Sequence, residues 1–260
     1  MKKLAHFIIA FMLWQSANVG YAHEPIYGLG PETLPKYMNA LEFGTRFSAR
    51  AGTFQYEFGY GLGITQNWTV RLDAPAINNG STYGLGDLRL RTKYVLWRKT
   101  APGVLKRLTA IAVLRLPTTN ENLGFNGATA MTLGIANGYE SRRWYYFSDI
   151  GYTYFKSATD TQTASRFRYN LVGGIRPIKT GYLKPDLVLL IELNGELSGK
   201  MRIDGNKQQK TGGNTLAVAP GFLLSYRNLM LKAGAQFGIA KTKNVNKIAT
   251  NGLISLEYHF

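Results

Sequence analysis

The feature that most constrains the fold of this chain is an alternation of apolar and polar residues with a period of two. Between residues 88 and 96, Leu88, Leu90 and Tyr94 occupy alternate positions. Charged residues, among them Arg91 and Lys93, stand between them. Successive side chains of a β-strand point to opposite faces, whereas a helix would distribute the same residues around its circumference. The pattern therefore predicts a strand with one apolar and one charged face.

About twelve segments of this kind follow, and they indicate an all-β chain. We predict strands at 37–49, 53–64, 67–76, 85–98, 104–117, 127–139, 143–156, 163–177, 184–197, 213–226, 228–241 and 250–260. Tight turns, as at Glu140-Ser141 and Arg227-Asn228, alternate with longer polar connections, as at 117–126 and 199–213. Alternating short and long connections are typical of a transmembrane β-barrel. The apolar and polar alternation by itself also fits a soluble β-sandwich.

Two further features favour the barrel. Aromatic residues gather at the predicted strand ends, as in the interfacial girdles of membrane barrels. They are Tyr60, Trp68, Tyr94, Trp144, Tyr226 and Tyr258 at one level and Phe47, Phe54, Tyr154 and Phe167 at the other. The last strand also ends in Tyr258 and Phe260, which resembles the assembly signal that barrel-assembly machinery reads in Gram-negative outer-membrane proteins. We therefore predict an all-β fold, a transmembrane antiparallel β-barrel of about 12 strands over residues 37–260.

The first 22 residues are predicted to be a secretory signal peptide. Lys2 and Lys3 precede a short apolar run at 4–14, and small residues at 20 and 22 match the positions that signal peptidase reads. The apolar run is shorter than the roughly 20 residues of a membrane-spanning helix. Cleavage near Ala22 would leave a periplasmic segment, 23–36, ahead of the barrel. The expected location is the cell outer membrane of a Gram-negative bacterium.

The chain has 31 basic and 15 acidic residues, a formal charge of +16. Such a charge suits nucleic acid, acidic lipid or an anionic solute. Export argues against nucleic acid. The expected partners are outer-membrane lipid, lipopolysaccharide that meets loop lysines such as Lys200 and Lys243, and a small-molecule solute. The chain has no cysteine, so it has no thiol nucleophile and no disulfide framework, and we expect no cofactor.

Two short motifs are similar to a known family. The stretch 83–88, Tyr-Gly-Leu-Gly-Asp-Leu, opens a predicted strand that runs through Lys93-Tyr94. It resembles the Gly-x-Gly-Asp motif of outer-membrane proteins of the "MetA-pathway of phenol degradation" type, often labelled as transporters. The stretch 23–31 resembles the start of mature proteins in the same group. The resemblance implies uptake or export of small solutes through the outer membrane.

Charged residues of the predicted strands fall on the face opposite to the lipid. An Arg or Lys that faced lipid near the middle of the membrane would cost about 2–4 kcal/mol. Eleven bases are therefore expected to line the barrel interior: Arg46, Arg71, Arg89, Arg91, Lys93, Arg107, Arg115, Arg166, Arg168, Arg176 and Lys232. Nine acids share that face: Glu42, Glu57, Asp73, Asp87, Asp149, Asp186, Glu192, Glu196 and Glu257. Two interpretations stay open, a ring of arginines that favours anions and a salt-bridged filling that holds the barrel rigid.

Candidates for catalysis or metal binding are few. His259 is the one histidine in the predicted barrel, and Ser255 lies too far along the strand for direct contact, so a lipid hydrolase is a remote alternative. Glu192 and Glu196 lie about 13 Å apart along a strand, too far for a glycosidase pair, and are expected to balance arginines. His23 would be the mature N-terminal residue, and its α-amine and imidazole are able to chelate copper. We expect a free, flexible terminus there instead, and no metal.

The sequence thus predicts an outer-membrane channel for passive passage of small solutes, with a mild preference for anions, and no enzyme. The segment 23–36 is rich in Pro and Gly and is short enough to reach into the lumen as a small plug. The alternative is a closed barrel that acts through basic extracellular loops on lipopolysaccharide or another partner.

Overall fold

The computed structural model describes residues 23–49, 52–78, 80, 82–119, 128–156, 161–178, 180, 184–245 and 250–260. The predicted signal peptide lies outside these ranges. Regular structure in the described residues consists of β-strands. None of these residues forms a helix that is long and apolar enough to cross a membrane.

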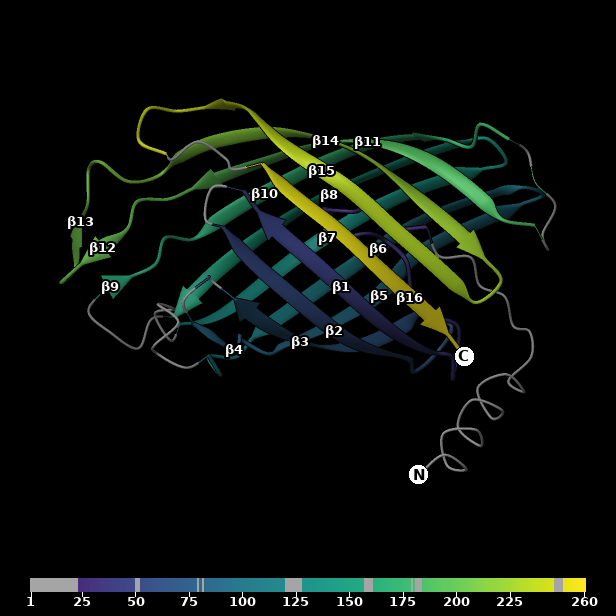
Figure 1. Ribbon diagram of the computed structural model, residues 1–260, viewed down its shortest axis with the longest axis horizontal. Helices are drawn as coiled ribbons and strands as arrows, with labels where there is room; N and C mark the ends of the chain where they lie inside the picture. The colour runs from purple at the N-terminus through teal and green to yellow at the C-terminus, as the bar shows by residue number, and fades with distance from the viewer. Residues whose placement is uncertain are drawn as a thin grey trace.

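Twelve long strands of the described chain form one closed antiparallel barrel (Figure 1). They are β1 (Asn39–Ser48), β2 (Thr53–Gly63), β3 (Trp68–Asn78), β5 (Arg89–Ala101), β6 (Val104–Arg115), β7 (Thr129–Ser141), β8 (Trp144–Lys156), β10 (Arg166–Ile175), β11 (Asp186–Ser198), β14 (Gly213–Tyr226), β15 (Leu229–Lys241) and β16 (Asn251–His259). Each strand pairs with the next in sequence, and β1 pairs with β16 from Ala40 opposite His259 to Ser48 opposite Asn251. This last pairing closes the barrel and confirms the predicted fold and strand number.

The two ends of the barrel differ. Short connections, including 102–103, 142–143 and 227–228, join strands at one end, which also carries the chain terminus at Phe260. The other end carries longer connections, with the small strands β4 (Tyr83–Leu85), β9 (Thr161–Gln162), β12 (Arg202–Ile203) and β13 (Asn206–Lys207). In Figure 1 these strands lie to the left and the C-terminus lies to the right. We call the two the long-loop end and the short-turn end.

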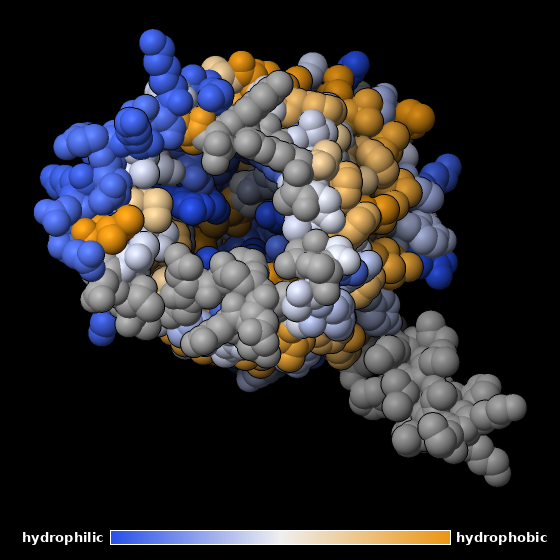
Figure 2. All heavy atoms as spheres, turned by 60° about the vertical axis from the view of Figure 1, so that its left-hand side comes forward, coloured by the Kyte–Doolittle hydropathy of each residue, from blue (hydrophilic) through white to orange (hydrophobic). Residues whose placement is uncertain are grey.

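The outer wall carries the apolar face of the strands. In β8, buried Tyr145, Phe147 and Asp149 alternate with exposed Tyr146 and Ile150. Part of this apolar outer surface is visible at the top and right of the barrel in Figure 2. Among the residues predicted for the aromatic girdles, Trp68 and Tyr94 are directly opposite one another on β3 and β5, and Phe47 is opposite Phe54. A barrel in lipid needs such an apolar outer face and a polar interior.

Three local features differ from the expected pattern. The register of β5 against β6 shifts between Val95 and Trp97, so that Leu96 and Trp97 are both exposed where strict alternation predicts one. A bulge inserts one residue and changes which residues face outward after it. The strand β7 continues through Ser141, so the turn lies at 142–143 and not at Glu140-Ser141. The four small strands of the long-loop end were not predicted, because two- or three-residue strands have no recognisable period.

Candidate functional site

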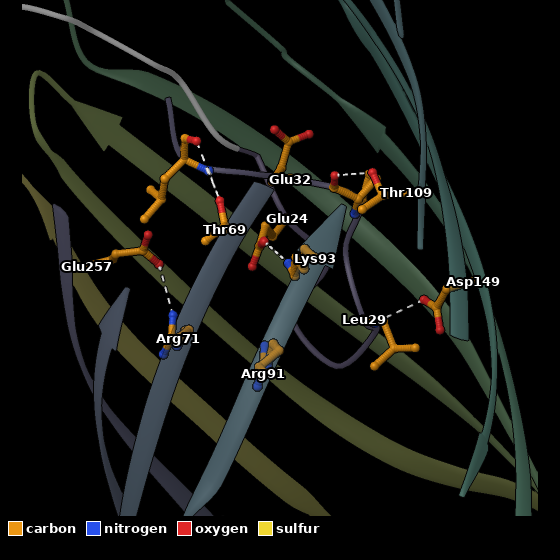
Figure 3. Close-up of polar contacts among 12 residues, drawn as sticks. Glu24, Leu29, Glu32, Thr69, Arg71, Arg91, Lys93, Thr109, Asp149 and Glu257 are labelled. Carbon is orange, nitrogen blue, oxygen red and sulfur yellow. Dashed lines mark hydrogen bonds and ion pairs between the residues drawn. The ribbon is translucent and has the colours of Figure 1, made fainter. Parts of the chain in front are cut away.

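The residues 23–36, here called the plug, fold inside the barrel. From the short-turn end the plug rises to the middle of the barrel at Tyr27–Leu29 and returns along β6 and β3. Tyr37 N then donates to Gly63 O, 2.7 Å away, before β1 begins. Figure 3 shows Glu24, Leu29 and Glu32 of the plug among side chains of the wall. His23 is buried, so the expectation of a flexible terminus there is wrong.

Glu192 of β11 holds the inner turn of the plug. The backbone N–H of Ile26 and that of Tyr27, 3.0 Å away, donate to the two carboxylate oxygens of Glu192. The side chain of Glu192 is fully buried, and no ion pair joins it to any arginine of the described chain. The expectation that Glu192 balances an arginine is therefore wrong. Its charge is compensated by backbone donors, which sequence spacing does not reveal.

Asp149 of β8 has a similar role on the opposite side of the turn. Its carboxylate accepts a hydrogen bond from Leu29 N at 3.1 Å (Figure 3) and one from the amide of Asn170 at 2.6 Å. Asn170 in turn accepts from Asn194, which accepts from Gln236 of β15. This row of amides crosses several strands at the level of the plug and fixes the carboxylate that holds Leu29.

The wall makes room for the plug through glycines. A Cβ on Gly221 of β14 would lie 2.2 Å from Cδ1 of Ile26, and one on Gly134 of β7 would lie 2.7 Å from Cδ1 of Leu29. Both distances are too short for carbon atoms in contact. The two apolar side chains of the plug therefore fit only where the wall lacks a side chain, and Ile26 packs among Phe147, Val172 and Leu223 in the buried core cluster.

The descending half of the plug is held by threonines and charges. Thr69 of β3 accepts from Leu34 N at 2.7 Å, and Thr109 of β6 donates to the carbonyl of Pro31 at 2.7 Å. Glu32 pairs with Arg107, and Glu24 in the rising half pairs with Lys93. Burial raises the pKa of the Glu32 carboxyl well above its ordinary value, although Arg107 opposes this shift. Thr69, Thr109 and Glu32 were not predicted, because nothing in their local sequence marks a distant partner.

His23 lies in an acidic pocket at the short-turn end. Its Nδ1 is 3.0 Å from Glu140, its Nε2 is 3.4 Å from Asp186, and its ring meets the edge of Tyr145. Burial lowers the pKa of His23, but the contacts with Asp186 and Glu140 raise the pKa by more than burial lowers it. The pKa of His23 therefore lies above its ordinary value. Glu24 points to Lys93 instead of joining this pocket. Nowhere in the described ranges do three His, Asp or Glu side chains form a group that could hold a metal ion.

The predicted interior charges form one shared cluster and several separate ion pairs in the wall. Arg71 contacts Glu42, Asp73 and Glu257, and Lys232 contacts Glu42 and Glu257 at 3.2 and 3.7 Å. Near the short-turn end, Arg176 pairs with Asp186, and it follows β10 rather than lying within it. Other predicted interior residues pair as Arg89 with Glu57, Arg91 with Asp73, Arg115 with Asp87, and Arg166 and Arg168 with Glu196.

Above the plug, a cavity of about 290 Å³ opens toward the long-loop end, and we call it the mouth cavity, or mouth. Figure 2 looks into this mouth and shows hydrophilic side chains around the hollow. Seven bases line it: Arg46, Arg89, Arg91, Arg115, Arg166, Arg168 and Lys232. Three acids do so: Glu24, Glu42 and Glu57. The mouth is therefore basic, while the acids Glu140 and Asp186 lie at the other end around His23.

The two residues of the predicted assembly signal lie where the barrel closes. Phe260 exchanges two backbone hydrogen bonds with Asn39, at 2.8 and 2.9 Å, and its ring stacks on Tyr258. His259 contacts Glu257, two residues away on the same face of β16. The structure thus places the imidazole beside a carboxylate.

A family model described as "Putative MetA-pathway of phenol degradation" matches residues 25–253. The chain belongs to this family. The match includes most of the plug, the eleven long strands from β1 to β15 and the first three residues of β16, and it confirms the resemblance inferred from the motif at 83–88. In the structure that motif precedes β5, and Asp87 accepts hydrogen bonds from the backbone and hydroxyl of Thr119 and pairs with Arg115.

Solved structures with a similar fold include three barrels. An outer-membrane channel from Pseudomonas putida F1 has a TM-score of 0.68 and 16% identity over 91% of this chain and 100% of that one. The NanC porin has a TM-score of 0.56 and 8% identity over 84% and 98%, and LpxR from Salmonella typhimurium has 0.51 and 7% over 85% and 100%. Comparison with curated protein sequences gives no match. At these identities the likeness is one of fold.

Proposed function

We propose that this chain is an outer-membrane channel that admits small solutes and favours anions. The observation that carries the proposal is the mouth cavity, where seven bases and three acids face one hollow of a closed barrel. Rings of Arg and Lys favour anions in pores because the positive potential raises their local concentration. The family and the channel from Pseudomonas putida F1 support a transport role. The apolar outer wall and the expected signal peptide support the location.

The test is the reversal potential of the refolded protein in a planar bilayer across a KCl gradient. We expect discrete conductance steps and a reversal potential on the chloride side. Arg46→Gln combined with Arg168→Gln removes two exposed charges of the mouth and is expected to move the potential toward zero. Arg142→Gln with Arg143→Gln, at the short-turn end, is the control with the same change in charge. A cation-selective current from the unmodified protein would contradict the proposal.

A second candidate function rests on the hairpin of β12 and β13. The described loop residues around it carry one acid, Asp204, and a group of exposed bases: Lys200, Arg202, Lys207, Lys210, Lys241 and Lys243. Figure 2 shows a hydrophilic mass at this side of the long-loop end. We propose that these bases meet phosphate groups of lipopolysaccharide. Replacing the four bases of 200–210 by Gln should weaken binding of phosphorylated lipopolysaccharide and leave binding of dephosphorylated lipopolysaccharide unchanged. If the unmodified protein binds the phosphorylated and dephosphorylated forms equally, the proposed phosphate contact is contradicted.

A further inference from the structure

Two guanidinium groups gather over one aromatic ring in the wall of the mouth cavity. The guanidinium carbons of Arg115 on β6 and Arg166 on β10 lie 5.2 and 5.3 Å from the ring centre of Phe155 on β8. Each has only a long contact with an acid, 3.5 Å to Asp87 and 3.7 Å to Glu196. Two positive charges on one ring repel one another, and an anion close to both would offset this repulsion.

Other arginines face the same cavity. Arg89 is directly opposite Arg115 in the β5–β6 register, a pairing of like charges that is unfavourable by itself. The Nε atoms of Arg89 and Arg91 are buried and donate no hydrogen bond to the described residues, and the buried Nε of Arg115 has only the 3.5 Å contact with Asp87. Arg46 forms no ion pair with any residue that the structure describes, and it is exposed to the cavity. Buried donors without acceptors are costly, so an anion bound in the cavity would supply acceptors that these donors lack.

The charges of this group do not cancel. We call the six arginines Arg46, Arg89, Arg91, Arg115, Arg166 and Arg168 the arginine cluster. Their acidic partners are four: Glu57, Asp73, Asp87 and Glu196. The two other bases near the cavity, Lys93 and Lys232, are matched by acids of the plug and of β1 and β16. Among the described residues that form ion pairs here, the bases therefore exceed the acids by two, and the carboxylates of Asp149 and Glu192 are held separately by N–H groups of the plug.

The cavity also has an apolar side. Leu29 of the plug, Val113, Phe155 and Leu253 line it beside the arginines. Its volume of about 290 Å³ is at the small end of ligand pockets, which range over about 300–1,000 Å³. A ligand with two negative charges and a short carbon body would match both the charge excess and the mixed lining.

We propose that the arginine cluster is a binding site for a small organic dianion, either a dicarboxylate or a phosphate monoester. The guanidiniums of Arg115 and Arg166 bind one anionic group between them, and Arg46 and Arg89 attract the other. Guanidinium suits both carboxylate and phosphate because its planar donors match pairs of oxygens. The inference deepens the proposed function and rests on it for the role of the bound ion as a transported solute.

Isothermal titration of the full-length refolded protein in detergent tests the site without requiring conduction. The probes are succinate, glycerol 3-phosphate and butyrate, the last a monoanion with the same number of carbons as succinate, at constant ionic strength in KCl. We expect at least one dianion to bind about tenfold or more tightly than butyrate. Tight succinate alone would assign the site to dicarboxylates, and tight glycerol 3-phosphate alone to phosphate esters. Dianions that bind no tighter than butyrate would overturn the proposal.

Variants locate the site. Arg115→Gln with Arg166→Gln is expected to weaken dianion binding about tenfold or more, whereas Arg142→Gln with Arg143→Gln at the short-turn end should leave it unchanged. Arg46 forms no ion pair with the residues that the structure describes, so we expect Arg46→Gln to fold normally and to weaken dianion binding several-fold. Undiminished binding in Arg46→Gln and in a folded double variant would overturn the site. Chloride conduction without dianion binding contradicts the site alone, and dianion binding without conduction contradicts the channel alone.

Discussion

A carboxylate that accepts two backbone hydrogen bonds in a buried place is hard to replace, because both donors lose their acceptor together. Glu192 holds Ile26 and Tyr27 in this way. Hydrogen bonds to a charged group contribute about 1.5–3 kcal/mol. Loss of both bonds costs about 3–6 kcal/mol, so Glu192→Ala should loosen the plug by about a hundredfold to ten-thousandfold, at about 1.4 kcal/mol for each factor of ten. We expect more frequent large-conductance openings in single-channel records.

The matched control for this variant is Glu196→Ala on the same strand. Glu196 pairs with Arg166 and Arg168, and it contacts no plug residue in the described chain. Glu192→Gln keeps one acceptor oxygen and should fall between the two. If Glu192→Ala opens no more often than Glu196→Ala, Glu192 does not hold the plug.

The pH dependence of the plug follows from His23 and Glu32. The pKa of each is raised when the plug is docked, for His23 by Asp186 and Glu140 against burial, and for Glu32 by burial. A raised pKa means that docking binds a proton more tightly than the released segment does. Docking is thus strongest below the pKa values of the released segment and weakens as pH rises through the raised ones. Burial raises the pKa of Tyr27 to about 12, so its hydroxyl stays protonated at the pH values at which His23 and Glu32 titrate.

Single-channel recording between pH 5 and pH 9 should therefore show openings that become more frequent toward alkaline pH. His23→Gln keeps a hydrogen-bonding side chain but removes the titration, and we expect a flatter profile with it. Arg176, Arg107 and Tyr145 also face this pocket. Openings that become less frequent with rising pH would contradict the assigned sign.

At the scale of single strands, the two faces of β11 have opposite requirements. Ile191 is 58% exposed on the outer face, next to Glu192, which is fully buried inside. Ile191→Arg should lower the free energy of unfolding in lipid vesicles by about 2–4 kcal/mol, the cost of Arg near mid-membrane. Ile203→Arg, in the small sheet of the long-loop end, should change it little. Equal effects in urea titrations would mean that β11 does not face lipid.

The last strand is where assembly is expected to be decided. Phe260 closes the barrel onto Asn39 and stacks on Tyr258. Replacing Phe260 by Ala should reduce the amount of heat-modifiable, folded barrel in the outer membrane, because the terminal aromatic would no longer be read by the assembly machinery. Tyr226→Ala, an exposed aromatic at a turn, is the comparison and should assemble nearly normally. Normal yields of the Phe260 variant would show that the terminal aromatic residue is not needed for assembly.

The strands of the barrel wall can be predicted from the sequence, because the alternation of apolar and polar residues within each strand shows which side chains face outward and which face inward. The predicted interior residues Arg71, Glu42 and Glu257 meet in one cluster, yet they come from three strands, and only closure brings them together. The bulge at Leu96 has no such signal. The contacts of the plug join residues that are far apart in the sequence, 35 positions between Leu34 and Thr69 and 120 between Leu29 and Asp149, and no local pattern specifies such a pairing.

The barrel as a whole has a lumen that is narrowed by the chain's own N-terminal segment. The plug contacts strands from many parts of the barrel, β3, β6, β8, β11 and β15 among them. The mouth cavity above it is lined in part by plug residues 24–29. Solute that enters the basic mouth must therefore pass around the plug or wait for it to move.

The most direct test of this claim is the single-channel conductance of a chain in which residues 25–35 are replaced by a Gly/Ser linker of equal length. The barrel wall is unchanged in this variant, and gel mobility before and after heating shows whether it has folded. We expect a conductance several times that of the unmodified protein, with the preference for anions retained. A folded variant whose conductance equals that of the unmodified protein would show that the plug does not limit passage.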